Sequence, residues 1–407
     1  MRNVVISTSL LVLLSACAQQ PSNMLDPCER YGFCPDQIQD PGTGPWTLVE
    51  PTKVGETCAL DYEALEAANV PEGASFAVIR YGKMCYVSGE DDMAVGSDVS
   101  HVFSVSKTLG ASLVGMTMYD SRYLADSSQK MRGPLKEFDR ADKWLNMDQL
   151  PDRTDIHPDA TIAHILSMEA YNDSLAYGDK RHRYDAAGTR EINQLIKVID
   201  NVVAQDPEGL GANALAVRDR LFAKLGFEHS TWPGQVFGYS WNTSMFDMGR
   251  LGLMILNGGI YNKERVMDAQ YVYNMTHPAF EDGSTRYGYL TWMAPLDCAP
   301  ISIHQKYPHG ISKATSCELD SGCEQQYDVG VWSANGARGQ FIIGHRALDL
   351  VIVGKNWQQT GANLLWNEVR PAVINADPVY KGDEDAFCKA YGAGDYAPEL
   401  KKWEGNL

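Results

Sequence analysis

A serine and a lysine three residues apart, Ser104 and Lys107, stand where a long apolar helical pattern begins. On a helix, residues i and i+3 share one face, so the amine reaches the hydroxyl. A serine hydroxyl is a weak nucleophile, and a neutral amine beside it takes its proton as attack begins. Burial lowers the pKa of a lysine and favours that neutral form. The pair therefore indicates acyl transfer through a serine nucleophile.

The spacing alone is not specific, because this serine and lysine content predicts about one such pair by chance. A second copy, Ser127 with Lys130, lies in a polar stretch with no apolar run behind it, and we interpret it as a solvated segment. Behind Ser104, apolar residues from Leu109 to Met116 follow an i, i+4, i+7 pattern that anchors one helix face in a core. Context favours the first pair, and an ordinary helix start is the alternative.

Elements on both sides of this helix have to position the pair. Short apolar runs typical of strands occur near both ends of the folded chain, at 75–80, 84–88, 329–333, 340–343 and 348–354. Helical periodicity dominates from about 110 to 280, with Ser244 as a capping residue and Gly226 and Gly258 as helix ends. We therefore expect a mixed α/β (α+β) fold. Its antiparallel sheet is built from both chain ends and flanked by helices, with a mostly helical inserted lobe.

The N-terminal stretch 1–16 resembles a bacterial lipoprotein signal peptide, with Arg2, an apolar run and the sequence Leu-Ser-Ala before Cys17. The resemblance implies that Cys17 is lipidated and becomes the new N-terminus. Ala18 after it favours anchoring to the outer membrane, on the periplasmic side. An ordinary secretory signal, which leaves a periplasmic or secreted protein, is the alternative.

The exported chain is expected to consist of a tether and one folded domain. Residues 17–46 are rich in Gln, Pro, Asp and Gly and have no periodicity, which is typical of a flexible tether. Residues 47–407 are predicted to form a single folded domain. Its sheet lobe spans about 47–105 and 285–407, and its helical lobe about 106–284.

Cysteine usage agrees with export. Apart from Cys17, eight of the nine cysteines remain, and an even number in an oxidising compartment predicts disulfides. Short-range candidates are Cys28 with Cys34, and Cys317 with Cys298 or Cys323. A zinc site is the competing interpretation, but no Cys-x-x-Cys or His-Glu-x-x-His occurs, so we expect no metal and no cofactor.

The formal net charge of −17 bears on partners. A strongly acidic chain repels nucleic acid and anionic membrane surfaces, so neither is an expected partner. Contact with a membrane is expected through the N-terminal lipid only.

Three separated segments resemble motifs of one enzyme family. The segments are His101–Lys107, Arg183–Thr189 and Trp332–Gln340, and they occur in the order shown by serine hydrolases of the class C β-lactamase superfamily. That superfamily includes class C β-lactamases, D-alanyl-D-alanine peptidases, certain esterases and 6-aminohexanoate-dimer hydrolases. The resemblance spans roughly residues 73–354 and implies a β-lactamase/transpeptidase-like fold.

The resemblance also implies roles. Ser104 matches the acylated nucleophile, Lys107 its proton acceptor, and Tyr184 the tyrosine that relays the proton between serine, lysine and leaving group. The main-chain N–H groups of Ser104 and Ala337 form the implied oxyanion hole. Asn335 and Gly336 occupy the strand beside the substrate; a half-buried tyrosine and a glycine-rich bulge are the ordinary structural alternatives for Tyr184 and Gly336.

Two departures from the family pattern concern the substrate. Ala186 stands where the family usually has Asn or Ser, and Ala334 replaces a lysine that helps to hold the carboxylate of a β-lactam or terminal D-alanine. Arg338 is either a substitute from an adjacent position or a solvated charge. We therefore expect a serine hydrolase that cleaves an amide or ester of a small-molecule or peptide-like substrate. The alternatives are a catalytically weak or inactive binding lipoprotein of the same fold, and a penicillin-binding D-alanyl-D-alanine peptidase or β-lactamase.

Overall fold

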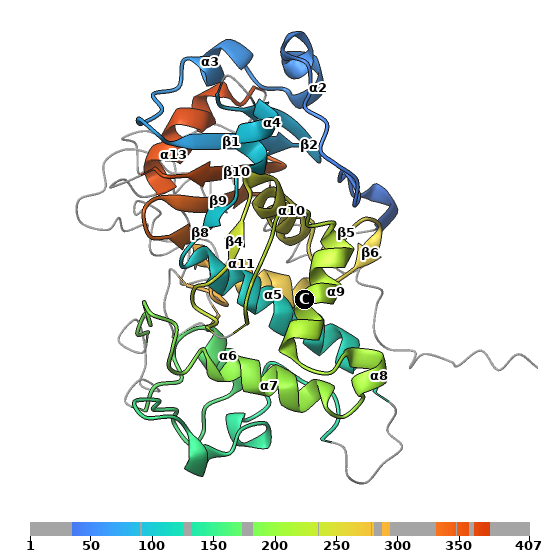
Figure 1. The fold of residues 1–407 in the computed structure, drawn as a ribbon, viewed down its shortest axis with the longest axis vertical. Coiled ribbons are helices and arrows are strands. Elements are labelled where there is room, and N and C mark those ends of the chain that lie inside the picture. The colour runs from blue at the N-terminus through green and yellow to red at the C-terminus, as the bar shows by residue number, and fades with distance from the viewer. Residues whose placement is uncertain are drawn as a thin grey trace, which may run out of the picture.

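A six-stranded antiparallel sheet with helices on both faces forms the upper lobe of the molecule (Figure 1). The structure is a computed structural model. It describes residues 35–89, 92–124, 132–172, 182–234, 236–277, 279–280, 287–293, 331–346, 348–357 and 362–374. The signal peptide, Cys17, the second pair Ser127 with Lys130, and the predicted short-range disulfide partners lie outside these residues.

The strand order shows how the sheet is assembled from distant parts of the chain. The strands are β1 (Ser75–Arg80), β2 (Lys83–Val87), β7 (Trp292–Met293), β8 (Val331–Gly336), β9 (Gln340–His345) and β10 (Leu350–Lys355). They are arranged in the order β2-β1-β10-β9-β8-β7. Strand β1 pairs antiparallel with β10, from Ser75 opposite Lys355 to Arg80 opposite Leu350. The predicted mixed α/β fold with a sheet built from both chain ends is confirmed.

Alternation along the strands creates one hydrophobic core on each face of the sheet. On β1, Phe76 and Val78 belong to one core, whereas Ala77 and Ile79 belong to the other. Successive strand residues point to opposite faces, so a strand covered on both sides needs apolar residues at every position. This explains why the central strands read as continuous apolar runs.

The helices divide between the two faces and the lower lobe. The smaller core is covered by α2 (Val54–Cys58), α3 (Tyr62–Glu66) and α13 (Ala362–Val369). The larger core is covered by α4 (Asp92–Ser97), α5 (Val105–Ser121) and α10 (Met245–Leu256). Further helices are α6 (Ile162–Leu166), α7 (Gln194–Val203), α8 (Pro207–Leu210), α9 (Ala214–Leu225) and α11 (Ala269–Thr276). Short 3-10 helices occur at Pro35–Gln37, Pro51–Lys53, Ala141–Lys143, Met147–Gln149 and Arg370–Ala372.

Two small ribbons complete the described fold, and no helix in the described residues is both long and apolar enough to cross a membrane. Strand β3 (Ser100–His101) pairs with β4 (Asn242–Thr243), and β5 (Ile260–Tyr261) pairs with β6 (Glu264–Arg265). The predicted cap is present, because the Ser244 side chain accepts a hydrogen bond from the Asp247 N–H at the start of α10.

Helix α5 lies at the centre of the molecule, between the sheet and the helices of the lower lobe (Figure 1). The sequence predicted one buried face, but the structure buries the helix on nearly all sides. Small residues make this close packing possible. A Cβ added at Gly110 would lie 2.3 Å from the Phe237 ring, and one at Gly115 would lie 2.4 Å from Tyr271. The middle of α5 is therefore packed closely against neighbouring side chains from more than one direction.

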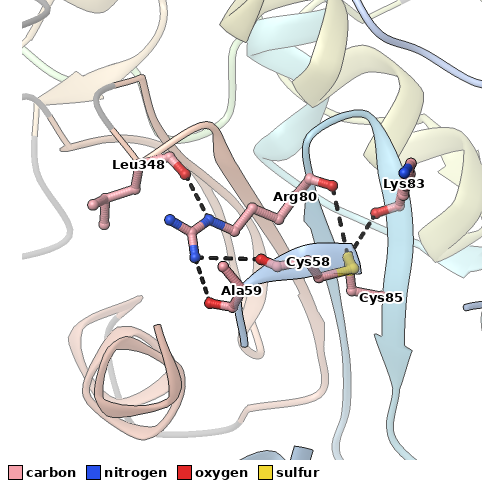
Figure 2. Close-up of a disulfide and its surroundings, with 6 residues drawn as sticks. All are labelled: Cys58, Ala59, Arg80, Lys83, Cys85 and Leu348. Atoms are coloured by element: carbon pink, nitrogen blue, oxygen red, sulfur yellow. Dashed lines mark hydrogen bonds between the residues drawn. A yellow bond between two sulfur atoms is a disulfide. The ribbon is translucent and has the colours of Figure 1, made fainter. Parts of the chain in front are cut away.

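A disulfide joins Cys58 at the end of α2 to Cys85 on β2 (Figure 2). The sequence predicted disulfides but not this pair. Beside it, the buried Arg80 donates hydrogen bonds to the carbonyl oxygens of Ala59 at 2.6 Å and Leu348 at 2.9 Å. The covalent bond and the guanidinium together attach α2 to the sheet.

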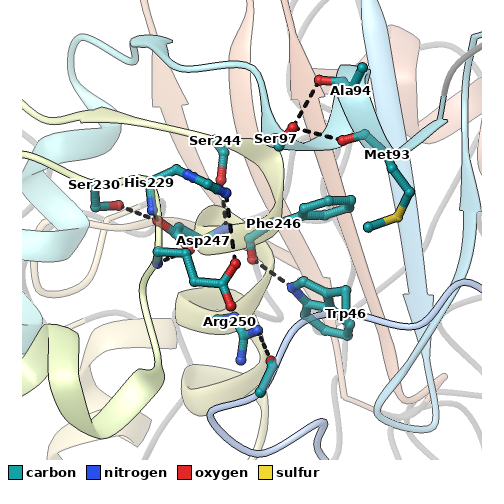
Figure 3. Close-up of polar contacts among 12 residues, drawn as sticks. Trp46, Met93, Ala94, Ser97, His229, Ser230, Ser244, Phe246, Asp247 and Arg250 are labelled. Atoms are coloured by element: carbon teal, nitrogen blue, oxygen red, sulfur yellow. Dashed lines mark hydrogen bonds and ion pairs between the residues drawn. The ribbon is translucent and has the colours of Figure 1, made fainter.

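The end of the predicted tether packs on α10 (Figure 3). The Trp46 indole donates a hydrogen bond to the Phe246 carbonyl at 3.1 Å. The buried Arg250 donates hydrogen bonds to the Gly42 and Gly44 carbonyl oxygens, and its guanidinium lies 5.3 Å from the centre of the Trp46 ring system. Residues 42–46 are therefore part of the folded body.

Candidate active site

Ser104 occupies the residue just before α5, in a strained turn. The preceding residue, Phe103, has a φ of 49°. This left-handed conformation costs roughly 1–3 kcal/mol for a residue with a side chain and is concentrated at functional sites. The turn is held at both ends, because the Val102 N–H donates to the Trp241 carbonyl and the Lys107 N–H donates to the Ser104 carbonyl.

Lys107 lies one helical turn after Ser104, and its amine contacts three oxygen atoms. Nζ is 2.9 Å from Ser104 Oγ, 3.1 Å from the Ala186 carbonyl oxygen and 3.1 Å from the Gly238 carbonyl oxygen. The side chain is buried, and burial lowers its pKa to about 8, an effect that the nearby carboxylate of Asp185 partly opposes. The predicted pairing of Ser104 with Lys107 is present.

Two loops supply the carbonyl groups that contact Lys107. They meet at Gly188 and Gly238, where a Cβ added to Gly188 would lie 2.1 Å from the Gly238 Cα. Neither loop tolerates a side chain at this contact. Asp185 shapes the first loop by accepting hydrogen bonds from the N–H groups of Gly188 and Arg190, at 2.9 and 3.0 Å.

Tyr184 completes the cluster from the same loop as Ala186. Its ring centre lies 5.0 Å from Lys107 Nζ. Burial raises the pKa of Tyr184, whereas an interaction with the Ser104 side chain acts to lower it. At neutral pH the hydroxyl therefore keeps its proton and is able to donate it.

Two aromatic residues form one wall of the site: Tyr287, which belongs to a stretch weakly resembling the family, and Trp292, which the sequence analysis missed. The ring centre of Tyr184 is 5.2 Å from Trp292 on β7 and 6.1 Å from the buried Tyr287. Trp292 belongs to no motif, and its role depends on a two-residue strand at the sheet edge. Sequence periodicity does not detect so short a strand.

The end of β8 lies against the turn before Ser104. A Cβ added at Gly336 would lie 2.2 Å from the Val102 carbonyl oxygen, so glycine alone permits this approach. Ala337 follows in an exposed turn, and Arg338 is exposed with a φ of 62° and its guanidinium 5.4 Å from the Phe103 ring centre. Asn335 is half-buried, and its Oδ1 has no hydrogen-bond partner among the described residues.

Position 334 of the third motif carries no cation. Ala334 is buried in the larger core, where the resembled family carries a lysine. The structure thus brings Ser104, Lys107 and Tyr184 together and places Gly336 beside them.

Comparisons with known proteins give only distant likenesses. No protein-family model matches the chain. No curated protein matches its sequence. Among solved structures, the chain is similar to a class C β-lactamase from Rhodobacter sphaeroides, with 14% identity, a TM-score of 0.42, and 79% of this chain and 98% of that chain covered.

Two further solved structures are similar to a comparable degree. One is a β-lactamase/D-alanine carboxypeptidase from Pseudomonas syringae, with 13% identity, a TM-score of 0.44, and 81% of this chain and 99% of that chain covered. The other is a D-stereospecific amidohydrolase from Streptomyces sp., with 14% identity, a TM-score of 0.43, and 75% and 96% covered. At such distances, conclusions about function depend on the geometry around Ser104.

Proposed function

We propose that the protein is a serine hydrolase that cleaves an amide or ester through an acyl-enzyme on Ser104. The supporting observation is the set of three oxygen atoms around Lys107 Nζ. The carbonyl oxygens of Ala186 and Gly238 only accept hydrogen bonds. A neutral amine has two N–H groups for these carbonyls and one lone pair, which is then directed at the Ser104 hydroxyl.

The reaction follows from this arrangement. Lys107 accepts the Ser104 proton as Oγ attacks the substrate carbonyl carbon. The backbone N–H groups of Ser104 and Ala337 stabilise the oxyanion, and Tyr184 passes a proton to the leaving amine or alcohol. Water then attacks the acyl-enzyme, and its proton returns through the same residues, so that the acid product is released and Ser104 is regenerated.

The end of β8 supports an extended substrate. Strand β7 pairs with Trp332 and Ser333, whereas no described strand pairs with the outer edge at Asn335 and Gly336. A small-molecule or peptide-like amide or ester fits this edge by adding backbone-like hydrogen bonds.

The alanine at position 334 argues against efficient turnover of β-lactams or D-alanine peptides. Without a cation there, the substrate carboxylate loses a charge-assisted contact. If the protein is instead a penicillin-binding peptidase, the mass of the intact protein after exposure to penicillin shows a stable adduct. If it is a β-lactamase, the penicillin is hydrolysed. We expect neither to be efficient.

A fluorophosphonate probe tests the central proposal. We expect covalent labelling of the wild-type protein and of Ser127→Ala, and no labelling of Ser104→Ala. Absence of labelling in a well-folded wild-type protein contradicts the proposal and favours the inactive binding lipoprotein. Screening esters, linear amides and D-peptides with the unlabelled wild-type protein then identifies the substrate class.

We further propose that the protein is exported and anchored to the outer membrane by a lipid on Cys17. The Cys58–Cys85 disulfide supports an oxidising compartment. Metabolic incorporation of an alkyne fatty acid tests the anchor. Label in the wild-type protein but not in Cys17→Ser is expected, and a soluble, unlabelled periplasmic protein contradicts lipidation.

A further inference from the structure

The imidazole of His101 lies between two strained residues near the proposed nucleophile. Its Nδ1 is 3.3 Å from the Phe103 amide nitrogen, and its Nε2 is 3.3 Å from the Ser240 amide nitrogen. In both contacts the backbone N–H group is the donor and the ring nitrogen is the acceptor. Phe103 has a φ of 49° and Ser240 a φ of 95°, conformations that a residue with a side chain rarely adopts.

These two residues belong to the segments that arrange the catalytic pair. Phe103 directly precedes Ser104, so its conformation sets the direction of the nucleophile. Ser240 follows two residues after Gly238, whose carbonyl oxygen accepts a hydrogen bond from Lys107 Nζ. Strained backbone persists only where neighbouring groups hold it, and His101 contacts both strained amides.

The protonation state of the ring decides what it is able to hold. A neutral imidazole has one nitrogen with a lone pair in the ring plane, so it accepts from Phe103 or from Ser240 according to its tautomer. An imidazolium carries a proton on both nitrogens and accepts from neither. Protonation would place N–H groups against N–H groups on both sides of the ring.

Groups from the neighbouring segments favour the neutral ring. In the described part of the chain, two titratable residues interact with His101. They are Arg338, on the turn after β8, and Tyr239, on the loop before β4. Burial, and secondarily the positive charge of Arg338, lower the pKa of His101 from its ordinary value of 6.5. The Phe103 ring packs edge-on against it at 4.4 Å between ring centres.

We propose that neutral His101 is a positioning residue: in one tautomer it holds the turn that carries Ser104, in the other the loop whose Gly238 carbonyl orients Lys107, and its protonation abolishes both contacts. This inference rests on the proposed hydrolase function. His101 touches neither the reacting atoms nor the substrate in this scheme. It acts through the two backbone amides.

The first consequence concerns the pH dependence of acylation. Above the pKa of His101, a single deprotonation at Lys107 controls the rate of fluorophosphonate labelling, so the logarithm of the rate rises with a slope of one. Below that pKa, two groups have to lose a proton, and the slope becomes two. A purely structural histidine leaves the slope at one throughout.

Two conservative variants separate the two contacts. In His101→Asn the amide oxygen takes the place of Nδ1 and accepts from Phe103, whereas in His101→Gln it takes the place of Nε2 and accepts from Ser240. Neither amide titrates. In both variants we expect the logarithm of the labelling rate to rise with pH with a slope of one. We expect His101→Ala to react with the fluorophosphonate about 10- to 100-fold more slowly than wild type at pH 8.5, because its nucleophile is displaced.

A matched control is available in the helical lobe. His157 Nδ1 accepts the Asp159 N–H at 3.0 Å, which repeats the local contact of His101 with Phe103. His157→Asn is expected to retain the wild-type rate and slope. Thermal unfolding of every variant shows whether a loss of rate reflects unfolding.

NMR of the protein labelled with ¹⁵N in phenylalanine and serine supplies a readout that does not require activity. We expect the amide signals of Phe103 and Ser240 to shift with one common midpoint, and this titration to vanish in His101→Asn and His101→Gln. The inference is overturned if the logarithm of the fluorophosphonate reaction rate rises with a slope of one at all pH values and the amide signals of Phe103 and Ser240 do not titrate. Amide signals that titrate in a protein that never labels support the positioning contacts and contradict the hydrolase instead.

Discussion

At the level of single residues, the carbonyl groups of Ala186 and Gly238 decide what Lys107 can do. Both carbonyl oxygens lie 3.1 Å from Nζ, and each accepts a hydrogen bond from one of its N–H groups. Burial removes the solvent that would stabilise a charged amine. In the proposed mechanism, these features leave a lone pair for the Ser104 hydroxyl and activate the serine as a nucleophile.

The first prediction concerns the pH dependence that Lys107 imposes. The pKa of Lys107 is lowered from 10.5 to about 8, and the base is the unprotonated form. Between pH 6.5 and 8, kcat/KM is therefore expected to rise about tenfold per pH unit, and to level off above pH 8. Measuring kcat/KM for an ester substrate over this range checks it.

Lys107→Arg serves as the matched variant, because a guanidinium keeps a positive charge but stays protonated at every accessible pH. Its rate should be at most about 1% of wild type, with no rise through pH 8. A wild-type rate that is flat from pH 6.5 to 9 contradicts Lys107 as the base.

Tyr184→Phe tests the proton relay. The substitution removes the hydroxyl that interacts with the Ser104 side chain and keeps the ring beside Trp292. We expect acylation to slow by about 100-fold or more, with little change in thermal stability. Stopped-flow measurement of acylation checks this. Tyr119→Phe, on α5 outside the cluster, is the control, and near-normal turnover of Tyr184→Phe removes the tyrosine from the mechanism.

At the level of elements, the contact between β8 and the start of α5 forms the site. Gly336 lies against the Val102 carbonyl group, two residues before Ser104. The strand and the helix come from segments more than two hundred residues apart, and they meet because β8 is joined to β9 and β10 in the same sheet. The oxyanion hole is proposed at this junction.

Gly336→Ala is expected to open this junction. The added Cβ would lie 2.2 Å from the Val102 carbonyl oxygen, so the strand has to move away from the helix. We expect acylation to fall by about 100-fold, as for a displaced oxyanion donor. Gly44→Ala, where an added Cβ meets nothing within 4 Å, is the control for a glycine substitution as such. Wild-type acylation in Gly336→Ala contradicts the proposed junction.

At the level of the whole molecule, two cores share one sheet, and a segment ahead of the sheet closes the larger core. Trp46 is only 5% exposed and belongs to that core, although it lies in a stretch whose composition suggests a tether. The guanidinium of Arg250 binds the carbonyl groups on either side of Thr43 and stacks on Trp46 (Figure 3). The folded body therefore begins ahead of residue 47.

Trp46→Ala is expected to lower the free energy of unfolding by about 3–5 kcal/mol, the usual cost of deleting a buried tryptophan. Urea unfolding followed by circular dichroism measures it. Phe138→Ala, at a side chain that is 65% exposed, should change stability by about 0.5 kcal/mol or less. Equal stability of Trp46→Ala and wild type would show that residues 42–46 contribute nothing to the fold.

The sequence by itself determined the features that depend on neighbouring residues. Continuous apolar runs located the strands, Ser244 and Gly226 located helix ends, and the spacing of Ser104 and Lys107 predicted that they share one helix face. Each of these patterns involves residues only a few positions apart, and the geometry of a single helix or strand fixes how such residues lie relative to one another.

Tertiary structure decided everything that joins residues distant in sequence. It selected Cys85 as the partner of Cys58. It also buried α5 on nearly all sides rather than one. The contacts of Lys107 with Ala186 and Gly238, and of His101 with Ser240, span tens to more than a hundred residues. Such contacts depend on how two cores pack around a shared sheet, and local patterns carry no information about that packing. The sequence predicted the pairing of Ser104 with Lys107, but not the contacts of Lys107 with Ala186 and Gly238.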